Sequence, residues 1–165
     1  MKDNEEEIKK FTETYLRELG ESVDIRGRVI LATILIEERI DKVIARYFCK
    51  KEKEQNFIFT FLRDPGIGFG IKTRILERIL KEISYPKAKT TMDHLNKIGS
   101  IRNLMAHSLE HNKSMELKEY SLRNIFNGKN QKTENIYDKF NLFEGYINKI
   151  NPLLNEIYVI VLDMK

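Results

Sequence analysis

A short segment near residue 100 combines side chains that suit phosphodiester chemistry. Arg102, Asn103 and His107 interrupt an apolar helical pattern. At about 100° per residue, Asn103 and His107 lie on one helix face, and the long Arg102 side chain can reach the same place. Imidazole, with a pKa of about 6.5, can take a proton from a 2′-hydroxyl or give one to a leaving oxygen. A guanidinium can bind the phosphate, so these residues can act on RNA without a metal.

The same three residues also admit a purely structural interpretation. Arg102 could pair with Glu37 or Glu38 across a helix interface. Asn103 could bond to a backbone carbonyl, and His107 could lie at a helix C-terminus, where the helix dipole favours a cation. Structural pairs of this kind are commoner than catalytic ones, so residue types alone favour this interpretation.

Two other motifs resemble ligand sites but lack a required part. The glycine-rich stretch 66–73 resembles a phosphate-binding loop, but Ile71 stands before Lys72 where such a loop has glycine. Residues 107–111 read His-Ser-Leu-Glu-His and match a zinc pattern, yet they lie where a helix should end. Zinc peptidases with that pattern are much larger and have a further acidic ligand. We therefore expect no metal and no other cofactor.

Helical periodicity dominates the chain and predicts an all-α bundle of about five helices. A small β-like or irregular insert is expected near 112–137, with a hairpin turn at Asn127-Gly128. The predicted helices cover residues 3–19, 24–48, 71–83, 90–109 and 138–164. Gly20 is the predicted end of the first helix, and residues 50–70 are a predicted connection. Thr90 to Asp93 has the pattern of a capping box, which would begin the fourth helix.

Two apolar patterns predict which helix faces are buried. Residues 29–36 are apolar nearly all round, which predicts a central buried helix. The helix at 71–83 carries one stripe, formed by Ile71, Ile75, Ile79 and Ile83. Pro152 interrupts the last helix and could kink it.

The size of the chain suits one domain over residues 1–165, large enough for a core without disulfides. Cys49 is the single cysteine and fits a reducing compartment. The acidic start lacks an apolar signal segment, and the longest apolar stretch, 29–36, is far shorter than a bilayer requires. We expect a soluble cytoplasmic protein without membrane contact.

The net charge of +4 is concentrated in one segment. Residues 71–90 hold six basic and two acidic residues, which leaves 23 of each sign elsewhere. The six basic residues are Lys72, Arg74, Arg78, Lys81, Lys87 and Lys89. A solvated helix face and a surface for a polyanion explain this pattern equally well. On the second interpretation, the RNA-binding residues are Lys72, Arg74, Arg78 and Lys81.

The segment from Arg102 to His107 resembles the R-N-x-x-A-H signature of the HEPN superfamily (higher eukaryotes and prokaryotes nucleotide-binding). Residues 24–40 resemble the long second helix of its mannitol-repressor-like branch. Phe69-Gly-Ile-Lys72 resembles the F-x-x-K segment that follows in that branch. The resemblance covers about residues 20–110.

This resemblance implies an all-α homodimer in which the Arg and His of both protomers form a metal-independent endoribonuclease site. Arg102 would then hold the scissile phosphate, His107 would act as general acid and base, and Asn103 would order the site. Many members of this kind are toxins or defence effectors, so an antitoxin or regulatory partner is possible.

Two features qualify the resemblance. Toxins paired with nucleotidyltransferase antitoxins carry a tyrosine two residues after the histidine, where this chain has Leu109. The mannitol-repressor-like branch also includes proteins described as regulators. The leading hypothesis is therefore a HEPN-type ribonuclease, and the alternative is a non-catalytic regulator or interaction protein.

Overall fold

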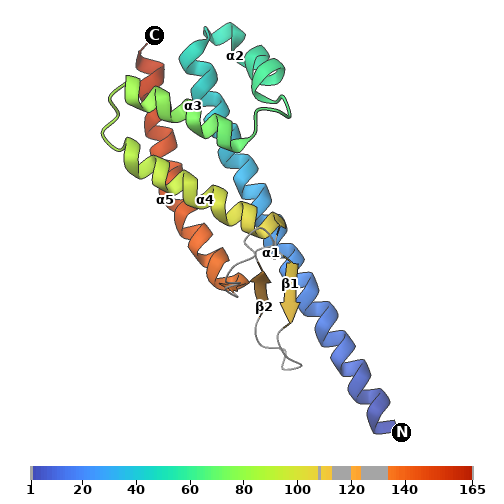
Figure 1. The fold of residues 1–165 in the computed structure, drawn as a ribbon. Helices are drawn as coiled ribbons and strands as arrows, with labels where there is room; N and C mark the ends of the chain where they lie inside the picture. The colour runs from blue at the N-terminus through green and yellow to red at the C-terminus, as the bar shows by residue number, and fades with distance from the viewer. Residues whose placement is uncertain (1, 108, 113–119, 124–133, 165) are drawn as a thin grey trace.

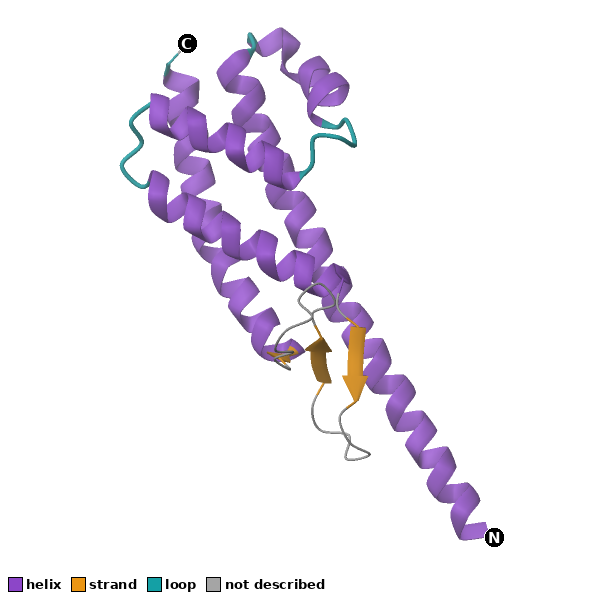
Figure 2. Cartoon of the chain, in the orientation of Figure 1, coloured by secondary structure: helices purple, strands orange, loops and turns teal. Residues whose placement is uncertain are grey.

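The structure is a computed structural model that describes residues 2–107, 109–112, 120–123 and 134–164. Side chains are described for residues 20, 23–106 and 136–164. The described chain is all-α apart from three short strands (Figures 1 and 2). Its helices are α1 Lys2–Phe48, α2 Lys51–Phe57, a π-helix Ile58–Leu62, α3 Phe69–Glu82, α4 Ala88–His107 and α5 Ile136–Asp163.

The helices form a bundle around α1. Helices α1 and α5 run in the same direction and α4 runs in the opposite one, while the first turns of α1 extend past the other helices (Figure 1). One cluster of buried apolar side chains joins α1, the π-helix, α3, α4 and α5. Its largest fully buried members include Ile40, Leu76, Leu95, Ile98 and Phe143. No helix in the part of the chain that the structure describes is long and apolar enough to span a bilayer.

Helix α1 corrects two predictions. It continues through Gly20, where the sequence predicted a break, since one interior glycine costs a helix only about 1 kcal/mol. Residues 29–36 are not buried all round either, because Leu31, Ile34 and Leu35 are 59%, 47% and 53% exposed. This helix therefore has an apolar face that no other described element covers.

The predicted connection at 50–70 is partly helical, which corrects a third expectation. Helix α2 turns back against the end of α1, where Arg46 pairs with Glu54 at 2.8 Å. The π-helix then buries Ile58 and Leu62 against the core. Only the segment 63–68 after it is irregular and leads into α3.

The predicted stripe of α3 is buried only in part, because Ile79 is buried and Ile75 and Ile83 pack against the core, but Ile71 does not. The buried side chains of this helix are Lys72, Thr73, Leu76, Ile79 and Leu80, whereas Ile71 is 37% exposed. Around the helix axis, Lys72 lies within about 20° of Ile79 and so shares its buried face. A lysine therefore faces the bundle interior.

The start of α4 differs from the predicted capping box. The helix begins at Ala88, so Thr90 lies inside it. The Thr91 hydroxyl donates to the carbonyl of Lys87 at 2.9 Å, four residues earlier. Before it, Ser84 has a left-handed backbone with φ 53° and turns the chain from α3 towards α4.

The predicted insert contains three antiparallel strands in the order β1-β2-β3. They are β1 Leu109–Asn112, β2 Tyr120–Arg123 and β3 Glu134–Asn135. Strands β2 and β3 pair in an antiparallel register in which Ser121 lies opposite Asn135, as expected for strands on either side of the predicted turn. The turn residues Asn127-Gly128 themselves lie outside the described residues. Helix α5 then runs through Pro152 as one helix.

Candidate functional site

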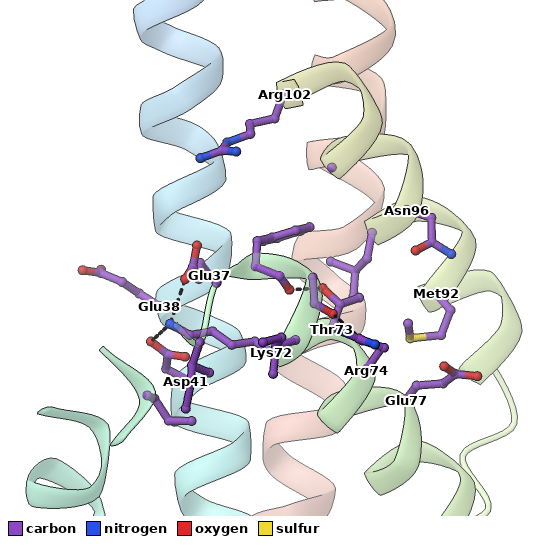
Figure 3. A pocket seen from close by; sticks show the side chains of 18 of the residues that line it. Glu37, Glu38, Asp41, Lys72, Thr73, Arg74, Glu77, Met92, Asn96 and Arg102 are labelled. Atoms are coloured by element: carbon purple, nitrogen blue, oxygen red, sulfur yellow. Dashed lines mark hydrogen bonds and ion pairs between the residues drawn. The ribbon is translucent and has the colours of Figure 1, made fainter. Parts of the chain in front are cut away.

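Helices α1, α3 and α4 enclose a groove of about 1490 Å³ together with the segment 62–70 (Figure 3). The first turn of α3 lies between α1 on one side and α4 on the other. Arg102 and Asn103 of α4 line this groove, and so do Lys72, Arg74 and Lys81 of α3. The structure thus brings two of the three predicted catalytic residues close to the basic segment.

Two side chains of the F-x-x-K segment dock α3 against its neighbours. Phe69 lies against Gly99 of α4, where an added Cβ would be 3.1 Å from the phenyl ring. Lys72, three residues later, pairs with Glu37 and Asp41 of α1. The segment therefore contacts both α4 and α1.

Lys72 is buried, contrary to its predicted role on an RNA-binding surface. Its side chain is 4% exposed, and Nζ lies 2.7 Å from Glu37 Oε1 and 3.0 Å from Asp41 Oδ2. Burial raises the pKa of the Asp41 carboxyl, while the hydrogen bond from Lys72 opposes that change. A lysine held this way by two carboxylates cannot also contact a phosphate in solvent.

Two further cations of the groove are paired with carboxylates. Arg63 lies 3.4 Å from Glu38, and Lys81 lies 2.7 Å from Glu77 in an exposed pair four residues apart. An exposed pair of this kind contributes about 0.3–0.5 kcal/mol. Lys81 is therefore held only weakly and stays accessible.

Three cations of the groove have no carboxylate partner among the described side chains, namely Arg74, Lys89 and Arg102. The groove as a whole holds six acidic and six basic residues. A polyanion would therefore be held by the placement of these three cations and not by net charge. Lys89 belongs to the basic segment, but no pattern in the sequence distinguishes it from its neighbours.

Arg102 is half-buried and is held in place by its neighbour. Its Nη1 donates to Asn103 Oδ1 at 3.0 Å, and the side chain extends across the groove towards α1 (Figure 3). The alternative pairing with Glu37 or Glu38 is not present in the described contacts. Those two carboxylates bind Lys72 and Arg63. Asn103 is the described hydrogen-bond partner of this guanidinium.

Two predicted cations lie elsewhere. Arg78 is exposed on α3 but lies outside the groove, although Arg74 one turn earlier lines it. Lys87 pairs with Glu156 of α5 at 2.8 Å, which ties the start of α4 to α5. The pKa of the Glu156 carboxyl is lowered chiefly by that hydrogen bond.

His107 is the last residue of α4, one helical turn after Asn103. Its side chain lies outside the described residues. His111 lies in β1 and not in α4, so the zinc-like pattern at 107–111 is not carried on one helix. Among the described side chains, no group of three or more histidine, cysteine or carboxylate residues is placed to hold a metal ion.

Comparison with protein-family models, curated proteins and solved structures gives no match to this chain. Its function must therefore be argued from the groove itself.

Proposed function

We propose that this protein is a metal-independent endoribonuclease of the HEPN type, with a site shared between two protomers. The observation that supports it most is the presentation of Arg102 in an open groove, oriented by Asn103 and unpaired with any described carboxylate. A guanidinium without a carboxylate partner can donate two parallel hydrogen bonds to a phosphate.

The proposed reaction uses the RNA's own 2′-hydroxyl. His107 removes its proton, the 2′-oxygen bonds to phosphorus, and the bond to the 5′-oxygen breaks as a second imidazolium protonates that oxygen. The products are a 2′,3′-cyclic phosphate and a free 5′-hydroxyl. Arg102 binds the non-bridging oxygens and stabilises the charge that develops on them. The second histidine would come from the partner protomer, which is why the proposal includes a dimer.

Neutralising Arg74 is expected to weaken RNA binding more than neutralising Arg78. Both are exposed arginines of α3, one turn apart, but only Arg74 lines the groove. The logarithm of the RNA association constant falls linearly with the logarithm of the salt concentration. Arg74→Gln should make this slope less steep by about 0.7, the value for one lost contact to single-stranded phosphate. Fluorescence anisotropy with a labelled single-stranded RNA at several salt concentrations measures this slope.

Arg78→Gln is the matched control and should leave the slope close to that of the wild type. Equal effects of the two substitutions would mean that RNA does not follow the groove.

The exposed apolar face of α1 supports the proposed dimer. Leu31, Ile34 and Leu35 lie on this face, and Ile34 also lines the groove. A second protomer packed here would lie next to Arg102. Leu31→Glu is therefore expected to convert the dimer to a monomer, because a buried unpaired charge opposes association. Light scattering after size exclusion measures the mass.

Phe48→Glu is the control for this experiment, since Phe48 is as exposed as Leu31, at 59%, but lies at the far end of α1. This variant should retain the mass of the wild type. A wild-type protein that is monomeric at every concentration would contradict the shared site.

The same face favours a second candidate function, a non-catalytic regulator or interaction protein. An apolar patch that no described element covers also suits a different protein partner. The two candidates differ in RNA turnover. A regulator would not cut RNA even as the wild type, and its His107→Ala variant would still bind the partner protein.

A further inference from the structure

Lys72 pairs with two carboxylates of α1, Glu37 and Asp41, that line the same groove as Arg102. Glu37 projects from α1 between the Lys72 ammonium below it and the Arg102 guanidinium above it (Figure 3). Both Glu37 and Arg102 line the groove. An arginine and a carboxylate on facing walls form a strong bidentate pair unless another cation holds the carboxylate.

We propose that Lys72 is a positioning residue that holds Glu37 away from Arg102 and so leaves the guanidinium free for a phosphate. The proposal rests on the proposed ribonuclease function, in which Arg102 binds the scissile phosphate. Lys72 itself does not touch the RNA, because its side chain is 4% exposed. Its effect is transmitted through Glu37.

The contacts explain why the buried lysine is suited to this task. Nζ reaches Glu37 at 2.7 Å and is fixed from its other side by the buried Asp41 at 3.0 Å. Glu37 is 25% exposed, so without Lys72 it could rotate towards solvent and across the groove. The neighbouring Glu38 is already paired with Arg63 and points outwards (Figure 3). Glu37 is therefore the carboxylate that would capture Arg102.

Two double variants of equal charge test this role. K72M/D41N removes the lysine and one carboxylate but leaves Glu37 ionised and unpaired. K72M/E37Q removes the same number of charges. Of the two carboxylates that pair with Lys72, it leaves Asp41, which is buried. A purely structural role for Lys72 predicts similar activity for both variants. A positioning role predicts that K72M/D41N cleaves RNA more slowly than K72M/E37Q.

We expect K72M/D41N to cleave RNA at least about tenfold more slowly than wild type, since one charge-stabilising donor is sequestered. K72M/E37Q should stay within about threefold of wild type, as the capturing carboxylate is gone. Thermal unfolding of both proteins establishes that they are folded at the assay temperature. Equal activities in the two folded variants, whether both low or both high, would overturn the proposal.

The same variants separate this proposal from the ribonuclease function. If the wild type does not cleave RNA, the function fails, and crystal structures of the two variants decide the positioning role. Arg102 within 4 Å of Glu37 in K72M/D41N supports it, while Arg102 still bonded to Asn103 alone overturns it. Should either methionine variant fail to fold, K72Q/D41N and K72Q/E37Q provide the same comparison with a polar side chain at position 72.

Discussion

Replacing Arg102 with alanine is expected to lower the rate of RNA cleavage by about 10²- to 10³-fold, the usual loss when one donor to a developing oxyanion is removed. The side chain is half-buried and its described contact is the hydrogen bond to Asn103. Its removal should therefore change the free energy of unfolding by no more than about 0.5 kcal/mol. Single-turnover cleavage and urea unfolding of the same preparation measure the two effects.

Arg102→Lys and Arg39→Ala sharpen this test. Lysine keeps the charge but cannot form the bidentate contact, so we expect an intermediate rate. Arg39 is an exposed arginine of α1 outside the groove, and its loss should leave cleavage unchanged. If Arg102→Ala instead unfolds the protein, or leaves the rate at the wild-type level, Arg102 is a structural residue.

Replacing Lys72 with methionine is expected to destabilise the protein by about 3–5 kcal/mol, the usual cost of removing one partner from a buried ion pair. The substitution leaves Asp41 buried at 3% exposure without its cation. Urea unfolding at pH 7 measures the loss. A lysine on an RNA-binding surface would show the opposite pattern, with weaker RNA binding and unchanged stability.

Asp41→Asn should restore part of that stability in the methionine background, because it removes the uncompensated buried charge. Lys81→Met on the same helix is the control, since Lys81 makes only an exposed pair with Glu77 and should change stability little. A methionine at position 72 with wild-type stability would contradict the buried ion pair.

Local patterns predicted most of the fold. The helices expected at 71–83, 90–109 and 138–164 begin and end within two residues of α3, α4 and α5. The break at Gly20 was wrong, because a glycine lowers helix propensity without forbidding the helix. The helical part of 50–70 was missed since its first residues are polar. Its stability comes from contacts across space, such as the pair between Arg46 and Glu54.

The candidate site was predicted only in part. Arg102 and Asn103 line the groove together with Arg74, Lys81 and Lys89 of the basic segment, whereas Arg78 and Lys87 lie outside it. Whether a lysine is exposed depends on how its helix is rotated in the bundle. Lys72 lies within about 20° of Ile79 and Ile83 around α3, so it shares their buried face despite its charge. The acidic partners of Lys72 lie 31 and 35 residues away on α1. No local pattern could have paired them.

Incubation of purified protein with total RNA in the presence of a chelator, wild type beside His107→Ala, tests the central claim most directly. We expect the wild type to yield fragments with 2′,3′-cyclic phosphate ends without added metal. His107→Ala should bind RNA but not cut it. Equal cleavage by both proteins, or wild-type cleavage that stops with chelator and returns with a divalent metal, would contradict the account.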